Sequence, residues 1–183
     1  MGIIAGLPIG GASEKEYQVH FGKNIVTEMR APLLPAEWAP QSGVQLTWPH
    51  TATDWAYMLD EVEDCFVKIA REIARREKLL IVTPDPEQVE KRIAGQVDRK
   101  NVRFLTCETN DTWARDHGAL AMTDADGVSL LDFKFNGWGL KFASDKDNLI
   151  TRRAVEAGTL HGRYVNRLGF VLEGGSIESD GMG

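Results

Sequence analysis

Two acidic, glycine-containing segments hold the residues of this chain whose types and spacing are best suited to chemistry. The first covers residues 110–118 (NDTWARDHG) and the second covers residues 172–178 (LEGGSIE). Each follows an apolar run typical of a β-strand. Carboxylates at strand ends beside an aromatic ring suit a planar cation, because a guanidinium presents five N–H donors in a rigid fork and a carboxylate can accept two of them. The pattern predicts a site for a guanidino ligand.

Two further motifs accompany these segments: residues 135–139 (FNGWG) lie between them, and residues 35–38 (PAEW) lie upstream. In this order, the four motifs resemble the agmatine deiminase and Porphyromonas-type peptidylarginine deiminase family, from about Met29 to the last residue. The resemblance implies an α/β fold of the pentein propeller type, present in part, with about two modules and the start of a third. It also implies a reaction in which a cysteine attacks the guanidinium carbon and ammonia leaves, with no metal and no organic cofactor.

The same resemblance implies roles for three residues. Asp116 and Glu173 correspond to the catalytic-site carboxylates that grip the guanidinium, and Trp113 corresponds to an aromatic residue near the substrate channel. Carboxylates gathered in an empty site repel one another, so we expect the pKa values of both carboxylates to be raised without ligand. From the residues alone, Asp116 could instead pair with Arg115 or cap a turn. The segment 136–139 is expected to be structural, with glycines that allow tight backbone paths.

The family's nucleophilic cysteine and its general acid/base histidine, which lies in a Gly-His-x-Asp segment, have no counterpart in these 183 residues. We therefore expect an N-terminal portion of such an enzyme, which binds a guanidine better than it converts one. Made alone, it is expected to associate or aggregate, because missing modules would leave apolar faces and strand edges uncovered.

The cysteines and histidines present are expected to be structural. Cys107 is close to the first motif, but its acidic neighbours disfavour the thiolate that an attack requires. Cys65 lies within the expected amphipathic helix, and its side chain is expected to be packed against the core. His117 is expected to point away from the site, because neighbours on a strand face opposite sides and Asp116 faces the ligand. His50 could line the entrance.

Composition narrows the class of partner. The chain is 43% hydrophobic and 26% charged, and its 21 basic and 27 acidic residues give a net charge of −6, which disfavours nucleic acid and favours a small cation. Two cysteines without Cys-x-x-Cys spacing argue against a disulfide framework or structural zinc and favour the cytoplasm. The N-terminus lacks a basic leader, so we expect neither a signal peptide nor a membrane partner. Residues 1–28 are taken as an extension of unknown role, and residues 29–183 as part of one catalytic domain, in a possible homo-oligomer.

Hydrophobic spacing predicts a mixed α and β order, although spacing alone would also allow an ordinary α/β sandwich. We expect a hairpin around an Asp-Gly turn, formed by residues 119–123 and 129–133. The other expected strands are 43–48, 78–83, 102–106, 170–173 and 176–179, and the expected helices are 56–76, 87–93 and 147–157.

Several functions stay open at this point. The favoured one is hydrolysis of agmatine to N-carbamoylputrescine and ammonia in polyamine biosynthesis, because residues 109–116 are most similar to bacterial agmatine deiminases. Peptidylarginine is the competing substrate, and a non-catalytic guanidine-binding module is a second class. A third class is a calcium or magnesium site, although the spacing of the acidic residues matches no compact metal loop; those residues are Asp111, Asp116, Glu173, Glu178 and Asp180.

Overall fold

The first half of the described chain is a three-stranded parallel sheet. The computed structural model describes residues 32–182, so the extension predicted at 1–28 lies outside the described residues. Strands β1 (Gly43–Thr47), β2 (Lys78–Thr83) and β3 (Val102–Thr106) pair in the order β1-β2-β3. Both faces of this sheet are covered, which explains why β2 is an almost unbroken apolar run. All three strands were predicted at these positions.

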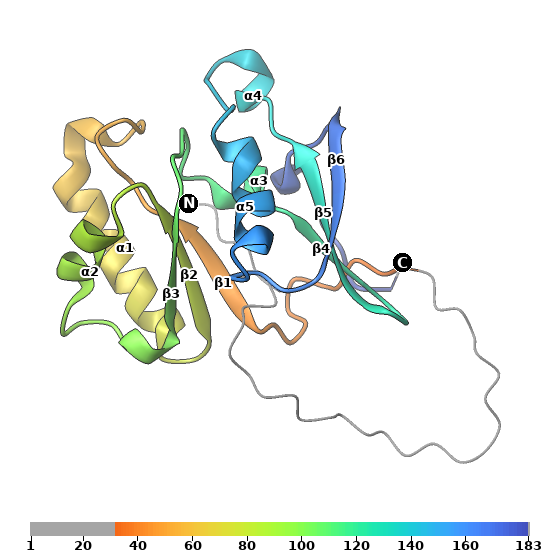
Figure 1. Cartoon of the computed structure of the whole chain (residues 1–183), viewed down its shortest axis with the longest axis horizontal. Helices are drawn as coiled ribbons and strands as arrows, with labels where there is room; N and C mark the ends of the chain where they lie inside the picture. The colour runs from red at the N-terminus through yellow and green to blue at the C-terminus, as the bar shows by residue number, and fades with distance from the viewer. Residues whose placement is uncertain (1–31, 183) are drawn as a thin grey trace, which may run out of the picture.

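Two helices cover one face of this sheet (Figure 1). The short 3-10 helix η1 (Ala56–Met58) leads into α1 (Leu59–Ala74), and α2 (Pro86–Ile93) follows β2. Asp85 caps α2, because its side chain accepts a hydrogen bond from the Gln88 amide. Both helices agree with the predicted ranges. The apolar stripes of the helices pack on the sheet in a buried cluster that includes Leu46, Trp48, Phe66, Val67, Ala70, Ile81, Val89 and Ile93.

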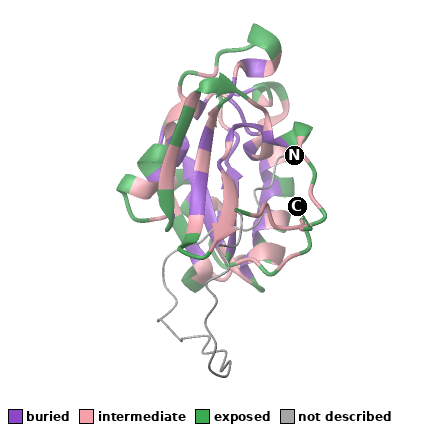
Figure 2. Ribbon diagram, turned by 90° about the vertical axis from the view of Figure 1, so that its right-hand side faces the viewer, coloured by how far each residue is buried: buried purple, intermediate pink, exposed green. Residues whose placement is uncertain are grey.

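The second half contains another three-stranded sheet and the helix that joins it to the first. Strands β4 (Leu120–Asp124) and β5 (Gly127–Lys134) form the predicted antiparallel hairpin, and β6 (Arg163–Val171) pairs parallel with β5. The 3-10 helix η3 (Asp147–Leu149) and α5 (Ile150–Glu156) occupy the predicted helical range. Figure 1 shows α5 between the two sheets, and its buried residues share one cluster with both sheets, formed by Leu80, Val82, Leu105, Leu130, Ile150 and Ala154. Figure 2 shows the buried residues concentrated along the interior strands.

The two predicted final strands differ from the structure. Strand β6 spans Arg163–Val171, so only residues 170 and 171 of the predicted strand 170–173 are in a strand. Residues 176–179 are not a strand, because the turn η4 (Gly174–Ser176) is followed by irregular backbone to residue 182. These last residues lie against the start of the described chain, where the Ser179 hydroxyl donates to the Leu34 carbonyl at 2.7 Å. Strand β6 was missed because it is a sheet edge with mostly exposed residues, so its sequence lacks a buried alternation.

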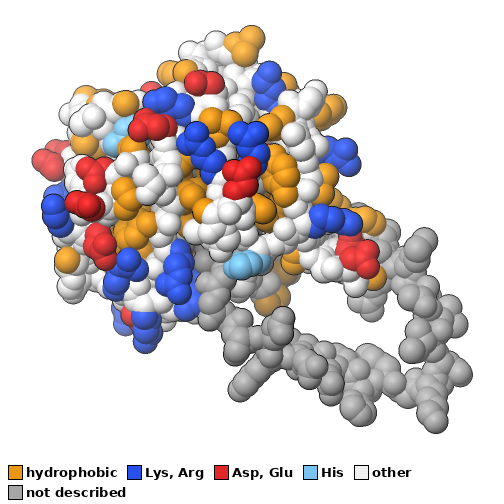
Figure 3. All heavy atoms as spheres, in the orientation of Figure 1, with side chains coloured by type: hydrophobic (Ala, Val, Ile, Leu, Met, Phe, Trp, Pro, Cys, Tyr) orange, Lys and Arg blue, Asp and Glu red, His pale blue; other side chains and the backbone are white. Residues whose placement is uncertain are grey.

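The surface is mixed in charge, and the edge strand β6 carries an exposed aromatic side chain, Phe170. Acidic and basic side chains are interspersed over the face drawn in Figure 3. Phe170 on β6 is 63% exposed and contacts Phe133 edge to face. No helix in the described range 32–182 combines the length and apolar composition that a bilayer crossing requires.

Candidate functional site

The carboxyl ends of the parallel strands form one side of the candidate site. Parallel strands end at the same edge of a sheet, and ligands commonly bind there. Pairing continues past the strands, because the Trp48 amide donates to Val82 O at 2.8 Å and the Cys107 amide donates to Thr83 O at 3.0 Å. His50 Nε2 therefore lies 2.9 Å from Thr109 Oγ1. Burial lowers the pKa of His50, which favours a neutral ring at this rim.

Asp111 organises the aromatic part of the site. Its Oδ1 accepts a hydrogen bond from the Trp113 amide at 2.7 Å, and its Oδ2 accepts one from Trp138 Nε1 at 3.1 Å. The rings of Trp113 and Trp138 stand perpendicular, with centroids 6.3 Å apart. One buried carboxylate thus holds the backbone of Trp113 and the indole of Trp138, which lie 25 residues apart in sequence, counted from 113 to 138.

Asp116 lies close enough to Glu173 and Asp111 for their charges to act on it. Asp116 is in the short helix α3 (Ala114–His117), is 8% exposed, and accepts a hydrogen bond from the Gly175 amide at 3.2 Å. Burial raises its pKa, and the nearby charges of Glu173 and Asp111 add to that increase. The predicted rise in pKa is confirmed for Asp116, with burial as its largest cause and repulsion as a smaller one.

Arg115, in the segment 110–118, contacts two of the other motifs, residues 35–38 and residues 172–178. Its guanidinium donates to Gly174 O at 3.1 Å and to Ile177 O at 3.0 Å, and it forms an ion pair with Glu37. The ion pair of Arg115 is therefore with Glu37, whereas the sequence left open a pairing with Asp116. The backbones approach so closely that a Cβ on Gly174 would lie 2.2 Å from the Arg115 carbonyl oxygen.

The fourth motif is a left-handed turn, labelled α4 (Gly137–Leu140). All four residues have positive φ, from 60° at Trp138 to 76° at Gly139. Leu140 N donates to Asn136 O at 2.8 Å, and the Asn136 side chain accepts from the Gly139 amide at 2.9 Å. The prediction of a tight, glycine-dependent backbone is confirmed. The turn places the Trp138 indole against Asp111.

His117 lies in the core. The reasoning that placed it away from the site assumed a strand, and this was wrong because the segment is helical. The ring is 2% exposed, lies 3.4 Å from Thr47 Oγ1 and packs near Phe135. Burial lowers its pKa to about 4, so it is neutral at pH 7.

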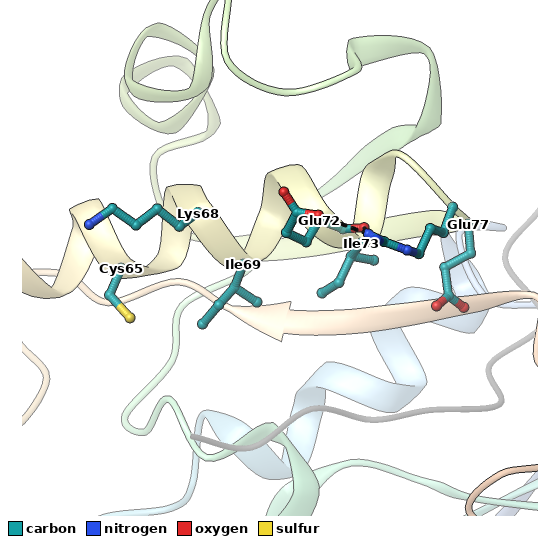
Figure 4. Close-up of a pocket in the computed structure, with 7 residues that line it drawn as sticks. Cys65, Lys68, Ile69, Glu72, Ile73 and Glu77 are labelled. Atoms are coloured by element: carbon teal, nitrogen blue, oxygen red, sulfur yellow. Dashed lines mark hydrogen bonds and ion pairs between the residues drawn. The ribbon is translucent and has the colours of Figure 1, made fainter.

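The two cysteines differ in environment. Cys107 is 2% exposed, and its sulfur donates to the Glu108 carbonyl and accepts from Arg153, both at 3.3 Å. Cys65 is exposed, so the prediction that its side chain is packed against the core is wrong. It lines a groove of about 400 Å³ on the flank of α1, with Ile69, Ile73 and Glu77 (Figure 4). Helix α1 covers the face of the first sheet opposite to α3, so this groove is separate from the acidic residues.

The comparisons with known proteins give the same family as the four motifs indicate. A family model described as Porphyromonas-type peptidyl-arginine deiminase matches residues 33–183. The chain belongs to this family. Solved structures of family relatives superpose on it, and the two α/β units are therefore a partial pentein fold, as predicted. Agmatine deiminase from C. jejuni with substrate bound gives a TM-score of 0.74 at 31% identity over 88% of this chain and 46% of that one. A putative arginine deiminase from Porphyromonas gingivalis gives 0.73 at 52% identity over 82% of this chain and 45% of that one.

Curated relatives of the family give the same result in sequence. A putative agmatine deiminase of Mycoplasma capricolum is 33% identical over 156 residues, or 82% of this chain and 41% of the relative. The agmatine deiminase of Stutzerimonas stutzeri is 31% identical over 159 residues, with the same coverage. The chain thus spans about two fifths of the length of the curated relatives it matches.

Sequence reasoning missed one buried acid beside the site. Asp147 is 1% exposed and accepts hydrogen bonds from the amides of Asn110 at 2.8 Å and Asp111 at 3.2 Å. Burial raises its pKa to about 6. Its position at the start of a predicted helix gave no sign of this contact. Among residues 32–182, no group of three or more acidic, histidine or cysteine side chains is arranged to hold a metal ion.

Proposed function

We propose that this chain contributes the guanidinium-binding carboxylates of an agmatine deiminase, which converts agmatine and water to N-carbamoylputrescine and ammonia. The observation that carries the proposal is the hydrogen bond from the Gly175 amide to Asp116, which brings the charge of Glu173 close to Asp116 from a segment 57 residues along the chain (173 minus 116). A guanidinium can satisfy two carboxylates at once through paired N–H donors. Binding such a cation would also relieve the repulsion from Glu173 and Asp111, which adds to the effect of burial in raising the Asp116 pKa.

The proposal assigns binding and orientation to this part of the protein, and the covalent step to residues beyond those described. In the family's reaction a cysteine attacks the guanidinium carbon. Cys107 is enclosed in the core and Cys65 lies on the far face of the first sheet. Neither described cysteine can reach the carboxylates of Asp116 and Glu173 from these positions. The nucleophile and the acid/base histidine are therefore assigned to the length of the relatives that this chain does not span.

Agmatine is favoured over arginine by charge. Arginine carries an α-carboxylate that agmatine lacks, and this group would be repelled by a site that already holds Asp111, Asp116 and Glu173. Free arginine is nevertheless the second substrate to test, because the Porphyromonas gingivalis structure at 52% identity is named a putative arginine deiminase. Peptidylarginine is the third, because the family model carries that name.

Calorimetric titration of the chain tests the proposal. Agmatine is expected to bind, and putrescine, the same diamine skeleton without the guanidinium, is expected not to. Asp116→Asn should weaken agmatine binding by about 2 to 5 kcal/mol, because it removes a charge-assisted contact from a buried pair. Glu173→Gln should act in the same direction. Glu90→Gln, an exposed acid paired with Arg99, is the matched control.

Equal affinity for agmatine and putrescine would overturn the proposed guanidine site. Unchanged affinity in Asp116→Asn would remove that residue from it. Parallel titrations with L-arginine and with acetyl-arginine amide decide the substrate, and tighter binding of either than of agmatine would reassign it.

A further inference from the structure

Asp147 connects the second module to the acidic loop of the site. The carboxylate lies in η3, after strand β5, and its Oδ1 accepts hydrogen bonds from two consecutive backbone amides of the loop, those of Asn110 and Asp111. The neighbouring Lys146 amide donates back to Asn110 Oδ1 at 2.9 Å. Three hydrogen bonds therefore fix the loop at Asn110 and Asp111, and Asp111 in turn holds Trp113 and Trp138.

The contacts continue from this anchor to the proposed ligand position. Asp111, whose amide is held by Asp147, accepts hydrogen bonds from the Trp113 amide and the Trp138 indole. Trp113 is the residue immediately before α3, and the Asp116 amide donates to the Trp113 carbonyl at 2.9 Å. A displacement of Asp111 would thus move both indoles and the helix that carries Asp116.

Stability alone does not account for a carboxylate at this position. Asp147 Oδ2 is buried and has no hydrogen-bond partner among residues 32–182. Burying a charge that is only partly hydrogen-bonded is costly, and a second carboxylate, Asp111, lies close enough to repel it. An unfavourable buried group of this kind is often retained where it orients a functional site.

We propose that Asp147 is a positioning residue, whose two bonds to the 110–111 backbone hold Asp111, the Trp113–Trp138 pair and Asp116 in the geometry that receives the guanidinium. The inference rests on the proposed function for its ligand. The anchoring contact itself can be tested without any ligand.

Four variants test the role of Asp147. Asp147→Ala removes both acceptor bonds, whereas Asp147→Asn keeps one carbonyl oxygen that can accept them. Asp132→Ala is the matched control, because Asp132 is also 1% exposed and hydrogen-bonded, to the Tyr164 hydroxyl at 2.8 Å, but it lies in strand β5. Trp138→Phe supplies the reference signal for loss of the indole contact.

Three measurements are made on each variant. In Asp147→Ala, the amides of Asn110 and Asp111 should exchange hydrogen about tenfold faster, because they lose their acceptor. The near-ultraviolet circular dichroism of tryptophan should shift towards that of Trp138→Phe. Agmatine affinity should fall on the order of 10- to 100-fold, as expected when groups around a site are displaced. Asp147→Asn should restore most of all three, and Asp132→Ala should lower thermal stability without changing them.

The outcomes separate this inference from the proposed function. If the unaltered chain fails to bind agmatine, the proposed function fails, while exchange and circular dichroism still decide whether Asp147 fixes the loop. Unchanged exchange at residues 110 and 111 in Asp147→Ala would overturn the anchor. Changes in Asp132→Ala equal to those in Asp147→Ala would show a purely structural role and would overturn the positioning assignment.

Discussion

Gly175 sets the position of the Asp116 carboxylate. Its amide donates to Asp116 Oδ1 at 3.2 Å, and a Cβ at this residue would lie 2.4 Å from the same oxygen. The adjacent Gly174 faces the Arg115 backbone instead. Gly175 therefore leaves room for the Asp116 carboxylate of the site, whereas Gly174 allows the close backbone packing of the fold.

Alanine at these two positions should produce different effects. Gly175→Ala should displace a side chain and weaken agmatine binding by about 1 to 3 kcal/mol, with a small change in thermal stability. Gly174→Ala meets backbone 2.2 Å away and should destabilise the fold by at least about 2 kcal/mol. Titration and thermal denaturation measure the two effects, with Gly169→Ala, which meets no atom within 4 Å, as the control. Equal loss of stability in both variants would contradict this division.

Individual site residues could be named from the sequence where a local motif marked them. Asp116, Glu173 and Trp113 belong to such motifs, and their roles in binding stay predictions. The structure brings the charge of Glu173 close to Asp116. Asp147 was not predictable in this way, because its role depends on a contact with Asn110 across 37 residues. Cys65 was placed wrongly because helical spacing indicates a face of the helix and not what covers that face.

At the level of elements, the left-handed turn α4 stores backbone strain next to the site. Left-handed geometry costs an ordinary residue about 1 to 2 kcal/mol, and both Trp138 and Leu140 adopt it. The Trp138 indole is held by its bond to Asp111. Leu140 is 83% exposed, so packing offsets little of its strain.

Two opposite substitutions test this strain. Leu140→Gly should raise the free energy of unfolding by about 1 kcal/mol, because glycine adopts φ of +65° without a steric cost. Gly139→Ala, which meets no atom within 4 Å but has φ of +76°, should lower it by about the same amount. Urea denaturation gives both values. A loss of stability in Leu140→Gly would show that the leucine side chain outweighs its backbone strain.

Elements with a strong apolar pattern were the predictable ones. Strand β2 is a buried apolar run and spans the predicted residues 78–83. Helix α1 has a periodic apolar face, and together with η1 it covers residues 56–74 of the predicted 56–76. Strand β6 has mostly exposed residues, and its place depends on pairing with β5, which sequence spacing does not reveal. Residues 176–179 were expected to form a strand, but the chain forms η4 at Gly174–Ser176, where Gly174 lies close to the Arg115 backbone.

For the whole molecule, two buried acids couple folding to pH. Burial raises the pKa of Asp132 and of Asp147 from 3.8 to about 6. A carboxyl with a raised folded pKa binds its proton more tightly when folded. Its stabilising contribution is therefore complete below about pH 4 and is lost as the pH rises through about 6.

Asp132→Asn tests this coupling, because the amide oxygen can still accept the Tyr164 hydroxyl but cannot ionise. The variant should be more stable relative to the unaltered chain at pH 7 than at pH 4, by about 2 to 3 kcal/mol. Urea denaturation at several pH values supplies the difference. A stability difference that stays constant from pH 4 to pH 7 would contradict the raised pKa.

The tertiary arrangement could be predicted only from the resemblance to a known family. Periodicity gave a mixed α/β order, and an ordinary sandwich would have satisfied it equally well. The two sheets are united through α5, where Ile150 packs in one buried cluster with Val82 on β2 and Leu130 on β5. These residues are far apart in sequence, so local spacing could not reveal that they meet.

The position of the guanidinium is the central claim, and a crystal structure of the chain with agmatine tests it most directly. We expect the guanidinium nitrogens at about 2.7 to 2.9 Å from carboxylate oxygens of both Asp116 and Glu173, with the ligand beside the Trp113 ring. Agmatine bound elsewhere, or bound with its ammonium end at Asp116 and Glu173, would contradict the account.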